Sequence, residues 1–265
     1  MKTLTITRKQ DLLEHRPAIE ELFFNSFGQR ALGSVWDWAY LDNPNGEPVV
    51  SLCYDEGRLV GHYAIVPMPL SCGVISMHSC IAMTTMVAQS HRKFGLFNQL
   101  VQENYRAATE QGVDFVFGFP NRQALPGLRK RVHWTLPETD YVATVSKETM
   151  LAAAKAGSFD KTGLLGLDLT DPVIRAWRLA RPGSTYTFEQ GLAFKRHQDG
   201  VDLLWWETPD ALASLPEDAS INVLVLASSG LESNRQFDYQ FGGIGLRSDF
   251  NATTINREMA ISDLF

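Results

Sequence analysis

The sequence predicts a mixed α/β (α+β) fold, in which a mainly antiparallel central sheet is flanked by helices and followed by a C-terminal α/β extension. In residues 1–145 the periodicities follow the order strand, helices, three antiparallel strands, helix, strand, helix, without the strict alternation of a doubly wound sheet. A run of 32 residues, 59–90, contains no Asp, Glu, Lys or Arg, as expected for consecutive buried strands.

The elements of the first part follow from local patterns. Leu4 and Ile6 alternate with polar residues, the first helix repeats apolar residues near a period of 3.6 until Gly28, and Gly112 ends the next long helix. In order, we predict a strand at 2–7, a helix at 11–27, an aromatic segment at 36–40 ending at the turn 43–46, strands at 49–54, 59–70 and 74–87 with turns at 55–58 and 71–73, a helix at 94–111, a strand at 113–119 and a helix at 121–132.

The pattern of the sequence changes after residue 145, so we place a domain boundary there. Residues 1–145 form the first predicted domain, and residues 146–265 form an extension that shapes an acceptor site or is a second, partial unit of the same type. The predicted elements of the extension are helices at 147–156 and 171–181, a loop at 157–166, strands at 203–207 and 221–227, and a polar turn region at 228–236.

Composition excludes several classes. The 265 residues are 45% hydrophobic and 20% charged, unlike disordered, collagen or coiled-coil chains, and the net charge of −6 argues against nucleic acid. The charge-free run is long enough to cross a bilayer, but Pro67 and Pro69 within it argue for two buried strands and no membrane span. The N-terminus lacks the pattern of a signal peptide.

The chain has three cysteines without metal-ligand spacing, which favours reduced thiols, a cytoplasmic location and no metal.

The most informative stretch is the junction at 84–97, where a buried strand runs through a basic turn into a helix. Such a turn directs free backbone amides and the positive end of the helix dipole at one point. Arg92 and Lys93 add full charges, and Gly95 allows close approach of an anion. The pattern is typical of a phosphate cradle, although strand-to-helix turns are common without any ligand.

This junction resembles the GNAT acyltransferase superfamily. Residues 92–97 (Arg-Lys-Phe-Gly-Leu-Phe) are similar to its Q/R-x-x-G-x-G/A signature, with Phe97 in place of the last small residue. Three further stretches resemble one branch of that family: 36–46 (its W-x-W-x-Y-x-x-N-P-x-G segment), 61–64, and 118–121 followed by 126–134. The ending, 261–265, is similar to tails in the branch that acylates amino sugars on nucleotide carriers.

The resemblance implies acetyl-CoA or another short acyl-CoA as co-substrate. The turn would wrap the pyrophosphate, the strand before it would pair by its backbone with the pantetheine arm, and the segment after the fifth strand would face a pantetheine amide. The implied CoA-binding residues are Met86, Val87, Arg92, Lys93, Phe94, Gly95, Leu96, Phe97 and Asn121.

The implied reaction is attack of an amine on the thioester, with backbone amides near Met86 and Val87 as oxyanion donors. Many family members carry a Tyr as general acid, and residues 124–128 contain none. Candidates for the base are His62, His78, Asp263 and the terminal carboxylate of Phe265, and a water-relayed base is the alternative. Lone histidines in apolar strands are more often core residues, and the tail is more often a frayed end.

Substrate-binding candidates are aromatic. Trp36, Trp38 and Tyr40, at spacing two, either close over a substrate or pack in the core, and we add Tyr63 from the similar third-strand stretch. A helical face with arginines at 175, 178 and 181 either is solvated or docks a diphosphate.

The resemblance therefore implies an acyl-CoA-dependent N-acyltransferase, a monomer or homodimer, which acylates the amine of a small molecule in a ternary complex. A nucleotide-linked (dTDP-type) amino sugar is the predicted acceptor. The alternatives are an aminoglycoside or peptide N-acetyltransferase and a non-catalytic CoA-binding module.

Overall fold

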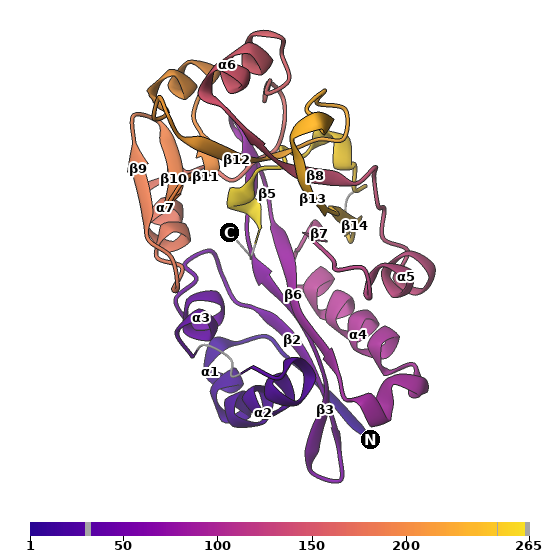
Figure 1. Cartoon of the computed structure of the whole chain (residues 1–265). Helices are drawn as coiled ribbons and strands as arrows, with labels where there is room; N and C mark the ends of the chain where they lie inside the picture. The colour runs from indigo at the N-terminus through magenta and orange to yellow at the C-terminus, as the bar shows by residue number, and fades with distance from the viewer. Residues whose placement is uncertain (30–32, 248, 263–265) are drawn as a thin grey trace. The chain divides into compact units, whose positions relative to one another are not determined.

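The structure is a computed structural model, which describes residues 1–29, 33–247 and 249–262 (Figure 1). It divides into two compact units. Unit 1 contains residues 1–69, 77–135 and 243–250, and unit 2 contains 70–76, 136–242 and 251–265. This division differs from the boundary that we placed after residue 145, because strand β8 (Asp140–Val145) pairs with other strands of unit 2.

Unit 1 is built on a six-stranded sheet with the strand order β1-β2-β3-β6-β7-β14. The pairs from β1 to β6 are antiparallel, and β6 pairs with β7 in parallel. Every residue of β3 after its first is buried, which explains why this strand carries no charge after Arg58. The strands are β1 (Lys2–Ile6), β2 (Val49–Asp55), β3 (Arg58–Pro67), β6 (Ser79–Val87), β7 (Phe115–Gly118) and β14 (Gly242–Gly245).

Two longer helices of unit 1 lie on opposite sides of strands β2, β3 and β6 (Figure 1). Helix α2 (Arg16–Phe27) ends at Gly28, whose φ of 69° is left-handed, and helix α4 (Leu96–Glu110) is followed by Gly112 with φ of 84°. Both glycine stops were predicted. The shorter helical pieces are α1 (Lys9–Leu12), η1 (Leu13–His15), α3 (Gly33–Trp36), η2 (Asp37–Leu41), η3 (Gln89–Phe94), α5 (Leu125–Gly127) and η4 (Leu128–Val132).

The two charge-free strands are shorter than predicted. β3 ends at Pro67, and a separate hairpin of β4 (Leu70–Cys72) and β5 (Ile75–Met77) precedes β6. Proline has no N–H to donate to a strand ladder, so Pro67 and Pro69 end the long strand where the simple pattern continued it.

Unit 2 is built on a second six-stranded sheet, with the strand order β13-β8-β12-β11-β10-β9. Its only parallel pair among the described residues is β11 with β12. Besides β8, the strands are β9 (Tyr186–Glu189), β10 (Leu192–His197), β11 (Gly200–Trp206), β12 (Ser220–Val225) and β13 (Arg235–Tyr239). The helical pieces are α6 (Lys147–Lys155), α7 (Pro172–Leu179), η5 (Pro209–Ser214), η6 (Glu232–Asn234), η7 (Ala252–Thr254) and η8 (Met259–Ile261).

The predicted fold class is confirmed: both sheets are mainly antiparallel and are accompanied by helices. In the part of the chain that the structure describes, no helix combines the length and the apolar character needed to cross a membrane.

Candidate active site

Strands β6 and β7 run together for only three residue pairs. Within the described residues, β6 pairs with β7 through Ser79, Cys80 and Ile81, opposite residues 115–117. Further along, Met83, Met86 and Val87 pair with β3 alone, and the Val87 carbonyl also accepts a hydrogen bond from Arg92 Nε at 3.3 Å. The β7-facing edge of this half of β6 therefore presents backbone N–H and C=O groups that an extended ligand can pair with.

A bulge interrupts β6 in this open half. Met83 pairs with Ala64, and Met86 pairs with His62. Two residues of β6, Thr84 and Thr85, therefore lie opposite the single β3 residue Tyr63. Thr84 has φ of +54°, a left-handed conformation that β-branched side chains rarely adopt. Strained backbone of this kind often marks a functional site.

His62 contacts the bulge from β3. Its Nδ1 lies 2.6 Å from the carbonyl oxygen of Thr84, and since that oxygen can only accept, Nδ1 carries the proton. The side chain is completely buried, and burial lowers the pKa of His62 to about 4 because the imidazolium loses its hydration. With a pKa of about 4, the buried imidazole of His62 binds a proton too weakly to suit the predicted role of general base.

The turn that the sequence predicts to bind phosphates lies at the end of the same strand. After β6, the turn η3 leads to Gly95, whose φ is +70°, and α4 begins at the next residue. The first amides of this 15-residue helix have no intrahelical partner and lie at the positive end of its dipole. Arg92 and Lys93 are exposed beside them, and a Cβ on Gly95 would meet nothing within 4 Å.

The other predicted residues of this turn differ in what they can offer. Phe94 is exposed, whereas Leu96 is buried and could contact a ligand only through its backbone. The ring of Phe97 packs edge-on against Tyr63 at 6.3 Å, so the residue that replaces the small one of the signature serves the core.

A contact that the sequence did not indicate ties the turn to the β2–β3 hairpin. His91 Nε2 lies 3.2 Å from Asp55 Oδ2, and His91 Nδ1 lies 2.8 Å from Ser90 Oγ. The hydrogen bond from His91 lowers the pKa of Asp55. The spacing of residues 55 and 91 does not predict this contact, because it forms only when the hairpin lies beside the end of β6.

The second predicted base, His78, is at the wrong end of β6. It directly precedes the strand, six residues before Thr84, which is roughly 20 Å of extended chain. Its backbone N–H donates to Asp114 Oδ2 at 2.9 Å, close to the paired start of β6 and β7. The structure thus separates His78 from the bulge. Asp263 and Phe265, the remaining candidates, lie outside the described residues.

The predicted aromatic substrate residues at 36–40 are core residues. Trp36, Trp38 and Tyr40 are 6%, 5% and 2% exposed, and the ring of Trp36 packs at 5.2 Å from that of Tyr40 and 4.6 Å from the guanidinium of Arg16. Of the two interpretations that the sequence allowed, the structure favours packing, because so little of each ring is left for a substrate.

Tyr63 is also buried and has a structural role. Its hydroxyl is 2.9 Å from that of Tyr105, which in turn accepts a hydrogen bond from Trp134 Nε1 at 2.8 Å. The prediction of Tyr63 as a substrate-binding residue is therefore wrong: it completes a buried polar network between β3 and α4.

Asn121 follows β7 and is exposed. Its Oδ1 accepts from the backbone N–H groups of Gln123 and Ala124, both at 3.0 Å, and so caps the turn into α5. Its contact with CoA stays a prediction.

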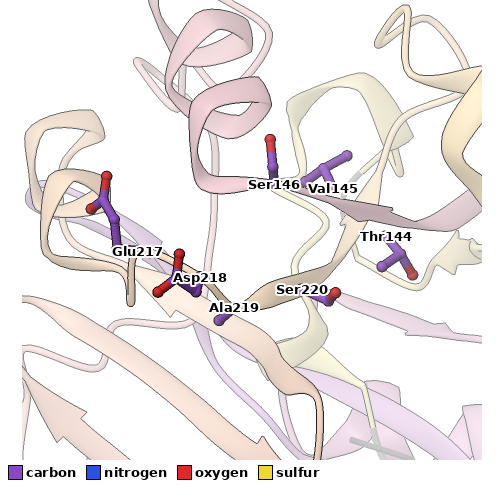
Figure 2. Close-up of a pocket in the computed structure, with 7 residues that line it drawn as sticks. All are labelled: Thr144, Val145, Ser146, Glu217, Asp218, Ala219 and Ser220. Atoms are coloured by element: carbon purple, nitrogen blue, oxygen red, sulfur yellow. The ribbon is translucent and has the colours of Figure 1, made fainter.

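Unit 2 contains a surface pocket of about 300 Å³ (Figure 2). The residues that line it come from the end of β8 and the residue after it, and from the loop before β12 and the first residue of that strand; none of them is a predicted site residue: Thr144, Val145, Ser146, Glu217, Asp218, Ala219 and Ser220.

The arginines of α7 do not form an open face. Arg178 is fully buried, and its Nε donates to the carbonyl of Ala260 at 2.7 Å. Arg175 donates to the carbonyl of Leu169 at 2.9 Å. Arg178 therefore holds the segment around η8 and is neither solvated nor available to a diphosphate.

Residues 14–136 match the family model described as acetyltransferase (GNAT) domain. This range includes the bulge, the open half of β6, β7 and the turn before α4. The matched range covers 123 of the 265 residues, so the similarity concerns this part of the chain. The match confirms the predicted enzyme class, an acyltransferase, and acyl-CoA is the co-substrate of this fold.

Solved structures, among them two GCN5-related N-acetyltransferases, resemble the chain over most of its length. A GCN5-related N-acetyltransferase from Kribbella flavida has a TM-score of 0.59 at 11% identity, covering 93% of this chain and 72% of its own. One from Anabaena variabilis ATCC 29413 has a TM-score of 0.58 at 14% identity, covering 92% and 73%. A conserved protein of unknown function from Enterococcus faecalis V583 has a TM-score of 0.63 at 8% identity, covering 93% and 73%. At these identities the likeness shows the fold alone.

No curated protein matches the chain in sequence. Within residues 14–136, the bulge lies in β6 and the basic turn follows at the end of that strand; the sequence predicted the turn but not the bulge. Across the described ranges 1–29, 33–247 and 249–262, no three His, Cys, Asp or Glu side chains are grouped as a metal site.

Proposed function

We propose that the protein transfers an acetyl or short acyl group from CoA to the amine of a small acceptor, by direct attack in a ternary complex. One observation carries the proposal. The open half of β6 ends at a basic turn with a left-handed glycine and a helix N-terminus. An extended amide-containing chain that ends in phosphates fits that arrangement, and the pantetheine arm and pyrophosphate of CoA have this form.

The proposed binding mode uses charge at one end and backbone at the other. The pyrophosphate lies at the amides of Gly95 and the first turn of α4, with Arg92 and Lys93 beside it. The pantetheine amides pair with β6 at Met86 and Val87. Thr84 is three residues, or about 10 Å, before Val87, and the thioester would lie at the bulge.

In the proposed reaction the acceptor nitrogen attacks the thioester carbonyl carbon, and the carbon–sulfur bond breaks. The nitrogen loses a proton to a base, and the sulfur leaves as a thiolate. Because a thiol has a pKa near 8.5, a thiolate leaves without a strong general acid, which is compatible with the absence of Tyr from residues 124–128. Holding amine and thioester together supplies much of the rate.

The base in this proposal is water-relayed or belongs to the tail. Neither His62, whose buried imidazole has a pKa of about 4 and binds a proton weakly, nor His78, at the far end of β6, suits the role. Asp263 and the carboxylate of Phe265 remain candidates from the resemblance.

The finer proposal is that the acceptor is a nucleotide-linked, dTDP-type amino sugar. It is supported by the similarity of residues 261–265 to the corresponding branch of the family. We also propose a cytoplasmic monomer or homodimer, and the thiols of Cys53, Cys72 and Cys80, all free, are compatible with a reducing compartment.

Calorimetric titration with CoA, followed by assays of thiol release from acetyl-CoA, tests both levels. A dTDP-linked amino sugar, an aminoglycoside and a peptide with a free amino terminus serve as acceptors. Release with the amino sugar supports the finer proposal, and release only with another amine replaces the acceptor. CoA binding without release with any of them favours a non-catalytic module, and the absence of CoA binding contradicts the proposal.

A further inference from the structure

The bulge in β6 has a disfavoured backbone conformation that other contacts must stabilise. Thr84 adopts a left-handed φ that its branched side chain disfavours, and such a conformation persists only where surrounding contacts over-determine it. The contact to the Thr84 carbonyl comes from His62 Nδ1 at 2.6 Å.

His62 reaches the bulge from a defined face of the sheet. Its neighbours Gly61 and Tyr63 face α4, since a Cβ on Gly61 would lie 2.8 Å from Leu100 and the Tyr63 ring packs on Tyr105. Side chains alternate along a strand, so His62 lies on the opposite face, where α2 contacts β3 and β6. It therefore pulls the Thr84 carbonyl towards the α2 side.

Because of the geometry of the peptide bond, the contact between His62 and the Thr84 carbonyl also fixes the direction of the Thr85 N–H. Thr84 C=O and Thr85 N–H belong to one peptide unit, which is planar and trans, so the two point in opposite directions. With the oxygen fixed at His62, the Thr85 N–H is directed away from the imidazole. Thr85 is exposed, in the half of β6 that β7 leaves unpaired.

We propose that His62 is a positioning residue, which holds the Thr84 carbonyl so that the Thr85 N–H donates to the thioester oxygen as negative charge develops on it. This inference rests on the proposed function. It replaces the sequence-based role of His62 as a base and moves the expected oxyanion donor from Met86 and Val87 to Thr85.

Neutral histidine suits this role. Nε2 is buried and has no hydrogen-bond partner among the described residues, so a second proton there would be a buried, unpaired charge. Desolvation is the main reason why the pKa of His62 is low. The imidazole thus stays a neutral Nδ1–H donor across the working pH range and gives the bulge one fixed orientation.

The matched variants His62→Asn and His62→Leu test this directly. The two side chains have nearly the same shape, but the Asn amide can place an N–H where Nδ1 was. We expect His62→Asn to keep kcat within about threefold of the original and His62→Leu to lower it by roughly 10- to 100-fold, since one lost oxyanion donor typically costs 100- to 1,000-fold and the N–H here is displaced rather than removed. The KM for acetyl-CoA and the Kd for CoA should change by less than about threefold in both. Equal kcat values for Asn and Leu, or an unchanged kcat in His62→Leu, would overturn the proposal.

A second measurement does not depend on turnover. Nitrogen NMR of the imidazole should show the neutral Nδ1–H tautomer from pH 5.5 to 8, and the Thr85 amide shift should move in His62→Leu more than in His62→Asn. An Nε2–H tautomer, a titration near pH 6.5 or an unmoved Thr85 amide contradicts the inference. If no amine is acylated, the proposed function fails by the assay, and these signals alone decide whether His62 holds the bulge.

Discussion

Comparing Gly95→Asp with Gly95→Asn measures the effect of a negative charge at the turn separately from the effect of adding a side chain. Gly95 has φ of +70°, and a Cβ there would meet nothing within 4 Å. Asn and Asp are the side chains that best tolerate the left-handed region, and they have the same shape. The pair therefore differs by one negative charge at the place proposed for the CoA phosphates.

The magnitude follows from the position of the charge. A carboxylate about 6 Å from a phosphate charge is repelled by about 0.7 kcal/mol in water and by about 3 kcal/mol at the effective dielectric of a protein surface, a factor of roughly 3 to 100 in Kd. At the N-terminus of α4 the same carboxylate stabilises the helix by about 0.3–1 kcal/mol. Gly95→Asp should thus bind CoA more weakly than Gly95→Asn and yet be at least as stable.

Calorimetric titration with CoA at low ionic strength gives the affinity, and urea unfolding gives the stability. Gly157 provides a matched control, since it has a φ of +83°, nothing within 4 Å of a Cβ, and belongs to unit 2. Gly157→Asp and Gly157→Asn should bind CoA equally. The difference at Gly95 should shrink as salt is raised. If the two folded Gly95 variants bind CoA equally at low salt, the phosphates do not bind at this turn.

Three further results are expected. The pKa of His62 is about 4 in the folded protein and about 6.5 in the unfolded chain, so the unfolded chain binds more protons between these values. Lowering the pH from 6.5 to 4 should therefore reduce the unfolding free energy of the wild type by about 3 kcal/mol relative to that of His62→Asn, as measured by urea unfolding. Tyr105→Phe should destabilise by about 2–4 kcal/mol in the same assay, because the buried hydroxyl of Tyr63 and Nε1 of Trp134 both lose a partner. Deleting residues 263–265 should lower the rate of thiol release more than CoA affinity, and a fully active truncation would remove the tail from the proposed site.

Local signals predicted much of unit 1. The β2–β3 hairpin, the helix that Gly28 ends and the strand–turn–helix junction at Gly95 each depend on residues close together in sequence, so periodicity and turn chemistry were enough. In unit 2 the strands 203–207 and 221–227 were predicted, whereas β8, β9, β10 and β13 were not. Their pairing partners are distant in the chain or, as in β9–β10, are joined by a two-residue Gln190–Gly191 turn with positive φ at both residues, in which Gln stands where Asn, Asp or Gly usually signals the turn.

The turn at 43–46 illustrates why a motif need not mark a site. Asn43 is buried, its Nδ2 donates to the carbonyl of Pro67 at 2.8 Å, and its Oδ1 accepts from the N–H of Asn45 at 3.0 Å. It thereby satisfies a carbonyl at the end of β3 and fixes the turn. The aromatic residues before it are buried for the same reason, since they pack the segment that Asn43 anchors. Spacing alone cannot tell a packed aromatic from one that covers a substrate.

The bulge is the feature that sequence reasoning had least chance to find, and the reason is physical. Thr84 and Thr85 are β-branched, so the intrinsic preference of both is for regular strand, and a helix or strand pattern gives no sign that one of them adopts a left-handed φ. The Thr84 carbonyl contacts a side chain 22 residues away, His62, whose own surroundings have the pattern of an uninterrupted apolar strand. Two local preferences are violated here: a polar histidine is fully buried in an apolar strand, and a β-branched residue has a left-handed φ. Such violations are expected at functional sites. For a lone histidine in a buried strand, the question to ask is therefore which backbone group it holds, before asking whether it titrates.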